Sequence, residues 1–203
     1  MSDHYYTDQP SSEHDEKTIT VHLAGDDYQF ITDSGVFSKN RMDQGSEILF
    51  NTFVEQASIT NGFRILELGS GYGPIIIGIG RTFPNSHCIG LEINKRAYEL
   101  SKRNADLNQV NNVDFIHGGL EDLSIETSVD HVLTNPPFRA GKILVHQFVN
   151  TAYSQLKSKG ALWVVVQRKQ GAPSLSKHMS AVFGNVERVA LEKGYWILKS
   201  IKS

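Results

Sequence analysis

The stretch FRILELGSGYGP, residues 63–74, decides the fold. Residues 63–68 are mostly apolar and suit a buried strand, while residues 74–82 suit a helix. Glycines between a strand and a helix permit a tight turn and let a ligand approach the backbone closely. Pro74 fits the first helical position, where the missing amide hydrogen costs no hydrogen bond. In an open α/β sheet such a turn lies beyond the carboxyl end of its strand, where ligands bind.

The alternation of strand and helix continues from this turn to the end of the chain. Its spacing predicts an α/β domain with a mainly parallel, seven-stranded sheet and helices on both faces. The turn at residues 192–194 is too short for a crossover, so the last strand is expected to run antiparallel. We expect strands at 63–68, 86–93, 113–117, 129–134, 161–167, 186–191 and 195–201, and helices at 74–82, 95–107, 142–157 and 174–183.

A hairpin and a helix precede this core. Residues 18–23 and 28–32 alternate apolar and polar side chains around a short turn, which predicts an antiparallel pair. Residues 46–58 carry apolar positions at helical spacing. The polar, acidic residues at the amino-terminal end lack such periodicity. We therefore expect a flexible acidic tail at 1–17 and one domain at 18–203, with the hairpin and helix at 18–60 and the core at 61–203.

The composition excludes several classes of protein. A chain of 203 residues suits one globular domain, and its apolar runs are far shorter than the about 20 residues of a membrane-spanning helix. No basic segment followed by an apolar one opens the sequence, so we expect no secretory leader and a cytoplasmic location. The single cysteine, Cys88, excludes an internal disulfide and a cysteine-cluster zinc site.

The formal net charge of −2 conceals an uneven distribution of charge. Residues 136–203 contain eleven Lys and Arg but only two acidic residues, a net of +9, so residues 1–135 carry about −11. Asymmetry of this size is typical of a protein that faces a polyanion such as a nucleic acid. Charge alone is equally compatible with basic side chains that solvate exposed helix faces.

The glycine-rich turn and Glu92 together indicate a nucleoside ligand. Glu92 ends the second expected strand of the core, where a carboxylate can accept hydrogen bonds from both hydroxyls of a ribose. The alternative is that Glu92 caps the helix beginning near Asn94, but the preceding turn favours ribose binding. The spacing Gly69-x-Gly71-x-Gly73 differs from the dinucleotide fingerprint, whose third glycine lies one residue later. This disfavours a nicotinamide-dependent oxidoreductase and favours a ligand with one adenosine and no phosphates.

A second motif, Asn135-Pro136-Pro137-Phe138, follows the strand expected at 129–134. Two prolines after a strand end its pairing and stiffen the backbone. The Asn135 amide and the Pro136 carbonyl could then accept the two hydrogens of an exocyclic amine, with Phe138 stacked on the planar group. Taken alone, the motif is better explained as a rigid turn with a buried Phe. Its place two parallel strands after the glycine-rich turn favours the functional interpretation.

These motifs resemble those of class I methyltransferases that use S-adenosylmethionine. More narrowly, the chain resembles small-subunit ribosomal RNA guanine-N2 methyltransferases over residues 5–201. The segments that carry this likeness are GVFS at 35–38 with DQGS at 43–46, NPPFRAG at 135–141 and QRKQGA at 167–172. The resemblance implies a Rossmann-like fold and methyl transfer to a guanine N2 amine of ribosomal RNA, free or in the small ribosomal subunit, with release of S-adenosylhomocysteine.

The resemblance also implies roles for individual residues. It implies that the cofactor is bound by Phe37, Asp43, Glu67, Gly69, Ser70, Gly71, Gly73, Glu92, Ile93, Gly119, Leu120 and Asn135. It implies that the catalytic residues Asn135, Pro136, Pro137 and Phe138 hold the target base. Where the family often carries an acid opposite the adenine amine, this chain has Gly119, so adenine recognition falls to backbone near Leu120, or to Glu121 or Asp122.

The basic residues and the histidines complete these expectations. Our candidates for RNA phosphate contacts are Arg139, Lys142, Arg168 and Lys169, because they flank the ends of the expected active-site strands. A sulfonium methyl donor carries an activated leaving group, and no histidine pair has metal-ligand spacing, so we expect no metal. We expect a monomer or a homodimer, and no membrane partner.

Three alternatives stay open at this point. The Asn-Pro-Pro motif is shared with adenine-N6 and protein-glutamine amino methyltransferases, although the net charge of +9 in residues 136–203 favours a nucleic acid over a protein. A non-catalytic RNA-binding assembly factor could keep the fold alone, but the intact motif beginning at Asn135 disfavours this.

Overall fold

The central sheet lies between two layers of helices. Its strands carry apolar residues on both faces, and these residues pack against the helices. In β7 (Leu156–Gln167), Ala161, Trp163 and Val165 face one core and Leu162, Val164 and Val166 face the other, all buried. This continuous apolar run is typical of a strand covered on both sides.

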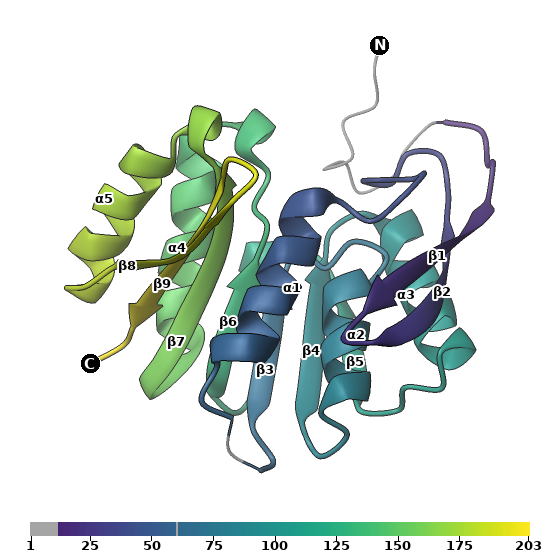
Figure 1. The fold of residues 1–203 in the computed structure, drawn as a ribbon, viewed down its shortest axis with the longest axis horizontal. Coiled ribbons are helices and arrows are strands. Elements are labelled where there is room, and N and C mark those ends of the chain that lie inside the picture. The colour runs from purple at the N-terminus through teal and green to yellow at the C-terminus, as the bar shows by residue number, and fades with distance from the viewer. Residues whose placement is uncertain (1–11, 60) are drawn as a thin grey trace.

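The computed structural model describes residues 12–59 and 61–203 (Figure 1). The order of its main sheet is β5-β4-β3-β6-β7-β9-β8, and in this sheet β9 runs antiparallel to both neighbours, which confirms the predicted fold. The other strands are β1 (Lys17–Leu23), β2 (Asp26–Thr32), β3 (Arg64–Leu68), β4 (His87–Glu92), β5 (Val113–His117), β6 (Val129–Thr134), β8 (Glu187–Glu192) and β9 (Tyr195–Ile201). The helices are α1 (Gln44–Gln56), α2 (Pro74–Thr82), α3 (Lys95–Leu107), α4 (Lys142–Gln155) and α5 (Ala172–Phe183), with short 3-10 turns η1 (Leu120–Asp122), η2 (Phe138–Ala140) and η3 (Arg168–Gln170).

Two separate hydrophobic cores define the two faces of the sheet. Helices α1, α2 and α3 pack on one face, and the β1–β2 hairpin lies against α3 at that side (Figure 1). Helices α4 and α5 pack on the other face. Within the described ranges, no helix combines the length and apolar character needed to cross a membrane.

The order of the strands creates a crevice beside β3. From β3 the chain proceeds outward through β4 to β5, then returns across the sheet to place β6 on the other side of β3. The loops after β3 and β6 therefore diverge at the carboxyl edge of the sheet. In open α/β sheets ligands bind at such a switch point.

Most elements that differ from their predicted bounds do so by one or two residues, and β7 differs most. Strand β7 begins at Leu156 instead of residue 161, because Leu156 pairs with Val129 across an irregularity in the β6–β7 ladder. The sequence KSKG at residues 157–160 is polar and has no apolar pattern, so the sequence alone does not predict this extension. Between β5 and β6 the connection contains only the short turn η1, so α4 and α5 alone cover that face among the described helices.

Residues 12–16, which we expected to belong to a flexible tail, lie against α3 and the loop after β2. Arg96 on α3 donates to the Ser12 backbone oxygen at 2.8 Å, and Arg103 forms a bidentate pair with Glu16 at 2.7 and 2.9 Å. Asp33, whose side chain is 1% exposed, accepts the Asp15 amide at 2.6 Å. Residues 1–11 of the expected tail lie outside the described residues.

Asp33 is the acceptor at the centre of these contacts. Burial alone would raise the pKa of Asp33, but hydrogen bonds from the Asp15 and Ser34 amides and from His14, with Arg96 close by, lower it overall. A carboxyl group with a depressed pKa in the folded state contributes stability above its unfolded pKa of about 3.9, and this stability is lost as the pH falls through the folded value.

We therefore predict that Asp33→Asn lowers the free energy of unfolding at pH 7 by about 1–3 kcal/mol, the usual cost of removing a charged hydrogen-bond acceptor. The variant should also show a flatter dependence of stability on pH below about 4 than the parent protein. Urea unfolding at pH 7 and pH 3 measures both effects. The exposed Asp27→Asn on β2 is the control, and equal losses in the two variants would contradict the role of Asp33.

Candidate functional site

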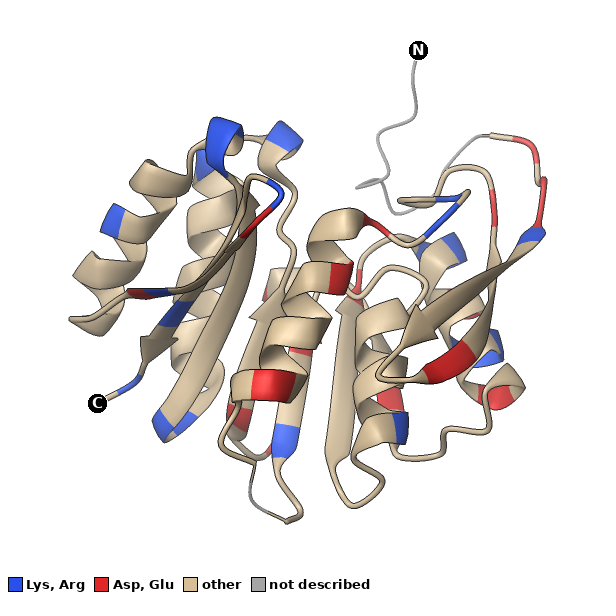
Figure 2. Cartoon of the chain, viewed as in Figure 1, with Lys and Arg blue, Asp and Glu red and all other residues tan. Residues whose placement is uncertain are grey.

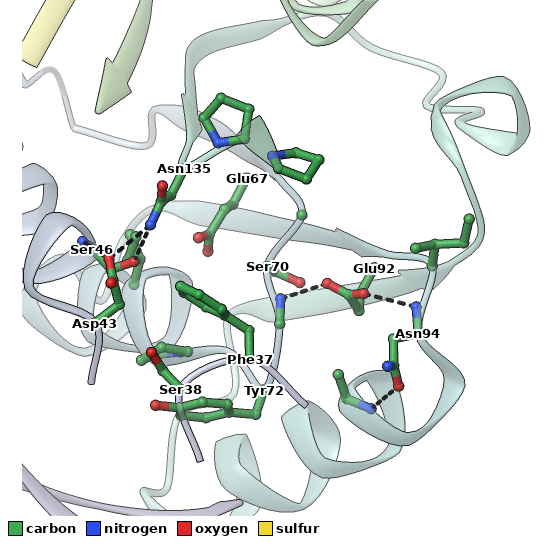
Figure 3. Close-up of a pocket in the computed structure, with 18 of the residues that line it drawn as sticks. Phe37, Ser38, Asp43, Ser46, Glu67, Ser70, Tyr72, Glu92, Asn94 and Asn135 are labelled. Carbon is green, nitrogen blue, oxygen red and sulfur yellow. Dashed lines mark hydrogen bonds between the residues drawn. The ribbon is translucent and has the colours of Figure 1, made fainter. Parts of the chain in front are cut away.

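The loops after β3, β4 and β6 enclose one cavity together with the segment that leads into α1 (Figure 3). The cavity has a volume of about 110 Å³. Gly71, Glu92 and Asn135, which come from three different loops, line this same space. The full lining is Phe37, Ser38, Asp43, Ser46, Glu67, Gly69, Ser70, Gly71, Tyr72, Pro74, Ile75, Glu92, Ile93, Asn94, Ala97, Asn135, Pro136, Pro137 and Phe148.

The glycine-rich turn leaves its backbone open to the cavity. Gly71 has φ +57°, and a Cβ placed there would meet nothing within 4 Å, so a ligand can approach its backbone. Gly73, also expected to bind the cofactor, does not line the cavity. It begins α2 with φ +95°, and a Cβ there would lie 2.7 Å from the Ile77 Cδ1 atom. Gly73 therefore allows the sharp entry into the helix.

Two buried carboxylates fix the loops around the cavity. Glu92 accepts the Gly71 amide at 2.7 Å through Oε2 and the Asn94 amide at 2.8 Å through Oε1 (Figure 3). The cap of α3 is Asn94, which accepts the Ala97 amide, so Glu92 is not the helix cap. Burial raises the pKa of Glu92. The Glu92 carboxylate keeps lone-pair capacity for a further donor, such as a ribose hydroxyl.

Glu67 is the second buried carboxylate, at the end of β3. It accepts the Ile76 amide of the first turn of α2 at 3.1 Å and is 2% exposed. Burial, with Glu92 nearby, raises the pKa of Glu67 well above its ordinary value. Burial therefore disfavours the charged form of Glu67, and a cationic or hydrogen-bond-donating ligand group would favour it.

Two hydroxyls on the cavity wall have no partner among the described residues. The Ser70 Oγ and Tyr72 Oη atoms are buried, and neither forms a hydrogen bond in that part of the chain. Burial, with Asp43 nearby, raises the pKa of Tyr72, so this hydroxyl stays protonated and can donate. Buried polar groups without partners are uncommon and costly, and here both line a cavity. They indicate a polar ligand.

The Asn135 amide has a fixed orientation at one end of the cavity. Its Nδ2 atom donates to Asp43 Oδ2 at 2.9 Å and to Ser46 Oγ at 3.0 Å (Figure 3). The adjacent Pro136 carbonyl accepts the Phe138 amide at 2.9 Å and keeps a second lone pair. The site therefore presents acceptors to a ligand from both Asn135 and Pro136.

Phe138 does not line this cavity, although we expected its ring to stack on the target group. The turn η2 directs Phe138 against the core beneath α4 and α5, where it borders a separate depression with Lys142, His146 and Leu175. The backbone hydrogen bond from Phe138 to Pro136 tightens this turn and accounts for the direction of the ring.

Gly119 and Leu120 line a second cavity of about 520 Å³ that adjoins the first through Gly69, Ile93, Pro137 and Phe148. Asp122 already accepts the Gly119 amide at 2.8 Å. Glu121 lines this second cavity, so of the two acids considered for adenine recognition it is the one placed beside the space.

Several lining residues escaped the sequence analysis. Tyr72 lies within the glycine-rich turn and Asn94 lies two residues after Glu92, so these two motifs were the sequence features that could have indicated them. Ser46 belongs to the DQGS segment, but its contact with Asn135 spans 89 positions of sequence. Phe148 lies in the middle of α4, where an apolar residue predicts only core packing.

The four basic candidates are exposed near the same edge of the sheet. Arg139 and Lys142 lie on η2 and at the start of α4, and Arg168 and Lys169 lie on η3 (Figure 2). None of the four forms an ion pair with a residue of the described ranges. Basic side chains without an ion pair at this edge of the sheet are suited to phosphate contacts. In the same described ranges, no group of three or more His, Cys, Asp or Glu side chains is placed to hold a metal ion.

Comparison with known proteins identifies the family. The model of the methyltransferase small domain matches residues 27–199. The chain belongs to the methyltransferase small domain family. It is 39% identical to the uncharacterised protein YbxB of Bacillus subtilis over 203 residues, the full length of both chains. It is 31% identical to ribosomal RNA small subunit methyltransferase C of Hahella chejuensis over 147 residues, which cover 70% of this chain and 41% of that protein.

A solved structure shares the fold of this methyltransferase. The Thermus thermophilus 16S rRNA N2 G1207 methyltransferase, in complex with AdoMet and guanosine, superposes with a TM-score of 0.83 at 23% identity. The match covers 96% of this chain and 52% of that one. The chain thus spans about half the length of the named ribosomal RNA methyltransferases that it matches, and the whole length of YbxB.

The cavity suits S-adenosylmethionine, the methyl donor of such enzymes. The open Gly71 backbone, the free lone pairs of Glu92 and the unpartnered hydroxyls of Ser70 and Tyr72 offer hydrogen bonds to the ribose and amino-acid portions. The adjoining space beside Ile93 and Glu121 provides room for a planar base.

We predict that Tyr72→Phe leaves the free protein as stable as the parent or up to about 2 kcal/mol more stable, because it removes a buried hydroxyl without a partner. The same change should weaken S-adenosylmethionine binding about fivefold, if that hydroxyl binds the ligand. Thermal melts and calorimetry measure the two effects. Tyr28→Phe is the control, because the Tyr28 hydroxyl already contacts the Gly78 carbonyl. A stability loss in Tyr72→Phe with unchanged affinity would contradict the assignment.

Proposed function

We propose that this methyltransferase transfers a methyl group from S-adenosylmethionine to the exocyclic N2 amine of a guanine in small-subunit ribosomal RNA, releasing S-adenosylhomocysteine. The observation that carries the proposal is the Asn135 amide, fixed with its oxygen available as an acceptor in the cavity that also contains Gly71 and Glu92. An acceptor beside a methyl-donor site suits a nucleophile that carries N–H groups.

The relatives support ribosomal RNA as the substrate class. One relative is named for the small ribosomal subunit, and the structural neighbour is described as an N2 methyltransferase of 16S rRNA with guanosine bound. The exposed basic residues Arg139, Lys142, Arg168 and Lys169 support a polyanionic substrate. A cytoplasmic site of action accords with such a substrate.

The residues of the cavity would hold the donor as follows. Glu92 would bind the ribose hydroxyls, and the turn from Gly69 to Gly71 would lie along the ribose and methionine portions. Ile93, Gly119 and Leu120 would contact the adenine. Phe37, 38% exposed on the loop before α1, would cover the methionine end.

Bound S-adenosylmethionine supplies a methyl group on a positively charged sulfur, which is already an activated leaving group. The amine nitrogen forms the new N–C bond as the C–S bond breaks, and the proton that the amine loses passes to solvent. Asn135 and Pro136 would align the nitrogen with the methyl group, and alignment of this kind can remove several kcal/mol of barrier. Their carbonyl dipoles would also stabilise the positive charge that develops on the amine.

The target base must leave its stack to reach Asn135. Extrusion of a base costs a few kcal/mol, least where the RNA is already single-stranded. Phosphate contacts from the basic residues on η2 and η3 would hold the RNA backbone beside the cavity while the base enters.

Asn135→Ala is expected to abolish methyl transfer while S-adenosylmethionine affinity stays nearly unchanged, because the amide would contact the substrate amine. Tritiated methyl transfer to ribosomal RNA and small subunits, followed by nucleoside analysis, measures turnover and identifies the product. Binding of the donor is measured by calorimetry. Normal incorporation by the variant would refute the role of Asn135, and label found only in N6-methyladenosine or in protein would refute guanine as the target.

Lys169→Glu is expected to weaken RNA binding and to reduce the slope of log affinity against log salt by about 1, the value for one lost phosphate contact. Filter binding at several salt concentrations measures the slope. Lys102→Glu serves as the control, because Lys102 is exposed on α3, on the face of the sheet opposite α4 and α5. An unchanged slope in Lys169→Glu would remove Lys169 from the interface.

A further inference from the structure

The Asn135 amide is held in one of its two possible orientations. Its Nδ2 atom carries two hydrogens, and both have acceptors, namely Asp43 Oδ2 at 2.9 Å and Ser46 Oγ at 3.0 Å (Figure 3). A carboxylate can only accept hydrogen bonds, so a flipped amide would bring its oxygen against the Asp43 carboxylate. The contact with Asp43 therefore directs the Asn135 oxygen away from α1.

The start of α1 supplies both of these contacts. Asp43 is the N-cap of the helix and accepts the Ser46 amide at 3.0 Å with the same oxygen that accepts from Asn135. Ser46 is 7% exposed, so its hydroxyl is shielded from competing water. The geometry of the helix cap thus fixes the two acceptors relative to each other before they contact Asn135.

Tyr195, the first residue of β9, packs against Gly45, which lies between Asp43 and Ser46 in the chain. A Cβ added to Gly45 would lie 2.9 Å from the Tyr195 Cε1 atom and 3.0 Å from Asp43 Oδ2. The ring therefore packs directly on Gly45, and only a glycine fits between the ring and the carboxylate. This contact explains the glycine of the DQGS segment and leaves Asp43 little room to move.

We propose that Asp43 and Ser46 are positioning residues that lock the Asn135 amide, so that the site selects a nucleophile with two N–H donors, a primary exocyclic amine. One hydrogen of that amine is accepted by the Asn135 oxygen and the other by the free lone pair of the Pro136 carbonyl. This inference rests on the proposed function and differs from the role implied by resemblance, in which Asp43 binds the methyl donor.

The test uses Asp43→Asn and Ser46→Ala in the full chain. Asparagine is as good an N-cap as aspartate, so Asp43→Asn keeps the helix cap and replaces the charged acceptor of the Asn135 amide by a neutral one. We expect kcat for methyl transfer to fall about fivefold in Asp43→Asn, the difference between a charged and a neutral hydrogen bond, and about fivefold in Ser46→Ala, which removes a neutral one. The dissociation constant of S-adenosylmethionine should stay unchanged in both variants, and Ser46→Thr, which keeps a hydroxyl, should retain activity.

RNA that carries inosine in place of the target guanosine separates selection of the amine from general binding. Inosine lacks the 2-amino group, so the parent protein should bind the guanosine RNA more tightly, and Asp43→Asn and Ser46→Ala should each lose part of this preference. The controls are Asp27→Asn on β2 and Ser154→Ala on α4, which are exposed and away from the cavity. A rise in the S-adenosylmethionine dissociation constant that matches the fall in kcat would overturn the proposal in favour of a donor-binding Asp43.

The lock can also be measured without any substrate. The side-chain amide signals of Asn135, assigned by their loss in Asn135→Ala, should exchange slowly with solvent in the parent protein and rapidly in Ser46→Ala. Rapid exchange in the parent protein would overturn the lock. Slow exchange in a protein that methylates no guanine would leave the lock standing and refute the proposed function.

Discussion

The reversal of strand order at β3 is the constraint on which the rest of the molecule depends. Because β4 lies on one side of β3 and β6 on the other, the loops that leave these strands separate at the carboxyl edge. Gly71, Glu92 and Asn135 lie at these strand ends and loops, and Asp43 lies on the segment that enters α1. The hydrogen bond from the Gly71 amide to Glu92 then ties the loop after β3 to the loop after β4 at 2.7 Å. The contact of Asn135 with Asp43 ties the loop after β6 to α1.

Burial and incomplete pairing give the cavity its chemistry. Glu67 and Glu92 are buried carboxylates with raised pKa values, and each is held by backbone amides instead of by a basic side chain. Ser70 and Tyr72 present hydroxyls that find no partner within the described residues. A buried hydroxyl without a partner costs stability, and a protein tolerates this where a ligand supplies the missing hydrogen bond. Both hydroxyls lie in the cavity beside the open backbone of Gly71. The unpartnered hydroxyls thus lie on the side of the cavity that would hold the donor, while on the substrate side both hydrogens of the Asn135 amide are paired.

Charged residues have different roles in the amino-terminal half and in the carboxyl-terminal third of the chain. Acidic residues of the amino-terminal half, such as Glu16 and Asp33, are engaged with Arg103, Arg96 and backbone amides, so they hold the loop that leads to Phe37. Basic residues of the carboxyl-terminal third stay exposed on η2, α4 and η3 beside the same edge (Figure 2). Glu16 and Asp33 are thus used within the fold, whereas the four cations on η2, α4 and η3 are exposed and form no ion pair with a described residue. This arrangement favours approach of a polyanion to the side that carries Asn135.

The sequence alone determined the order and type of the elements, because each strand and helix is a local pattern: α2, α3, β5, β6 and β9 have the predicted bounds. It also located the turn at Gly69–Gly73, Glu92 and Asn135, since glycine, proline and strand-end carboxylates have positional meaning. The tertiary structure decided what local pattern cannot contain. It paired Asn135 with Asp43 and Ser46, about 90 positions away in the chain. It turned Phe138 away from the cavity, and extended β7 to Leu156 by pairing with Val129. Each of these depends on where distant segments meet, and only packing of the whole chain fixes that.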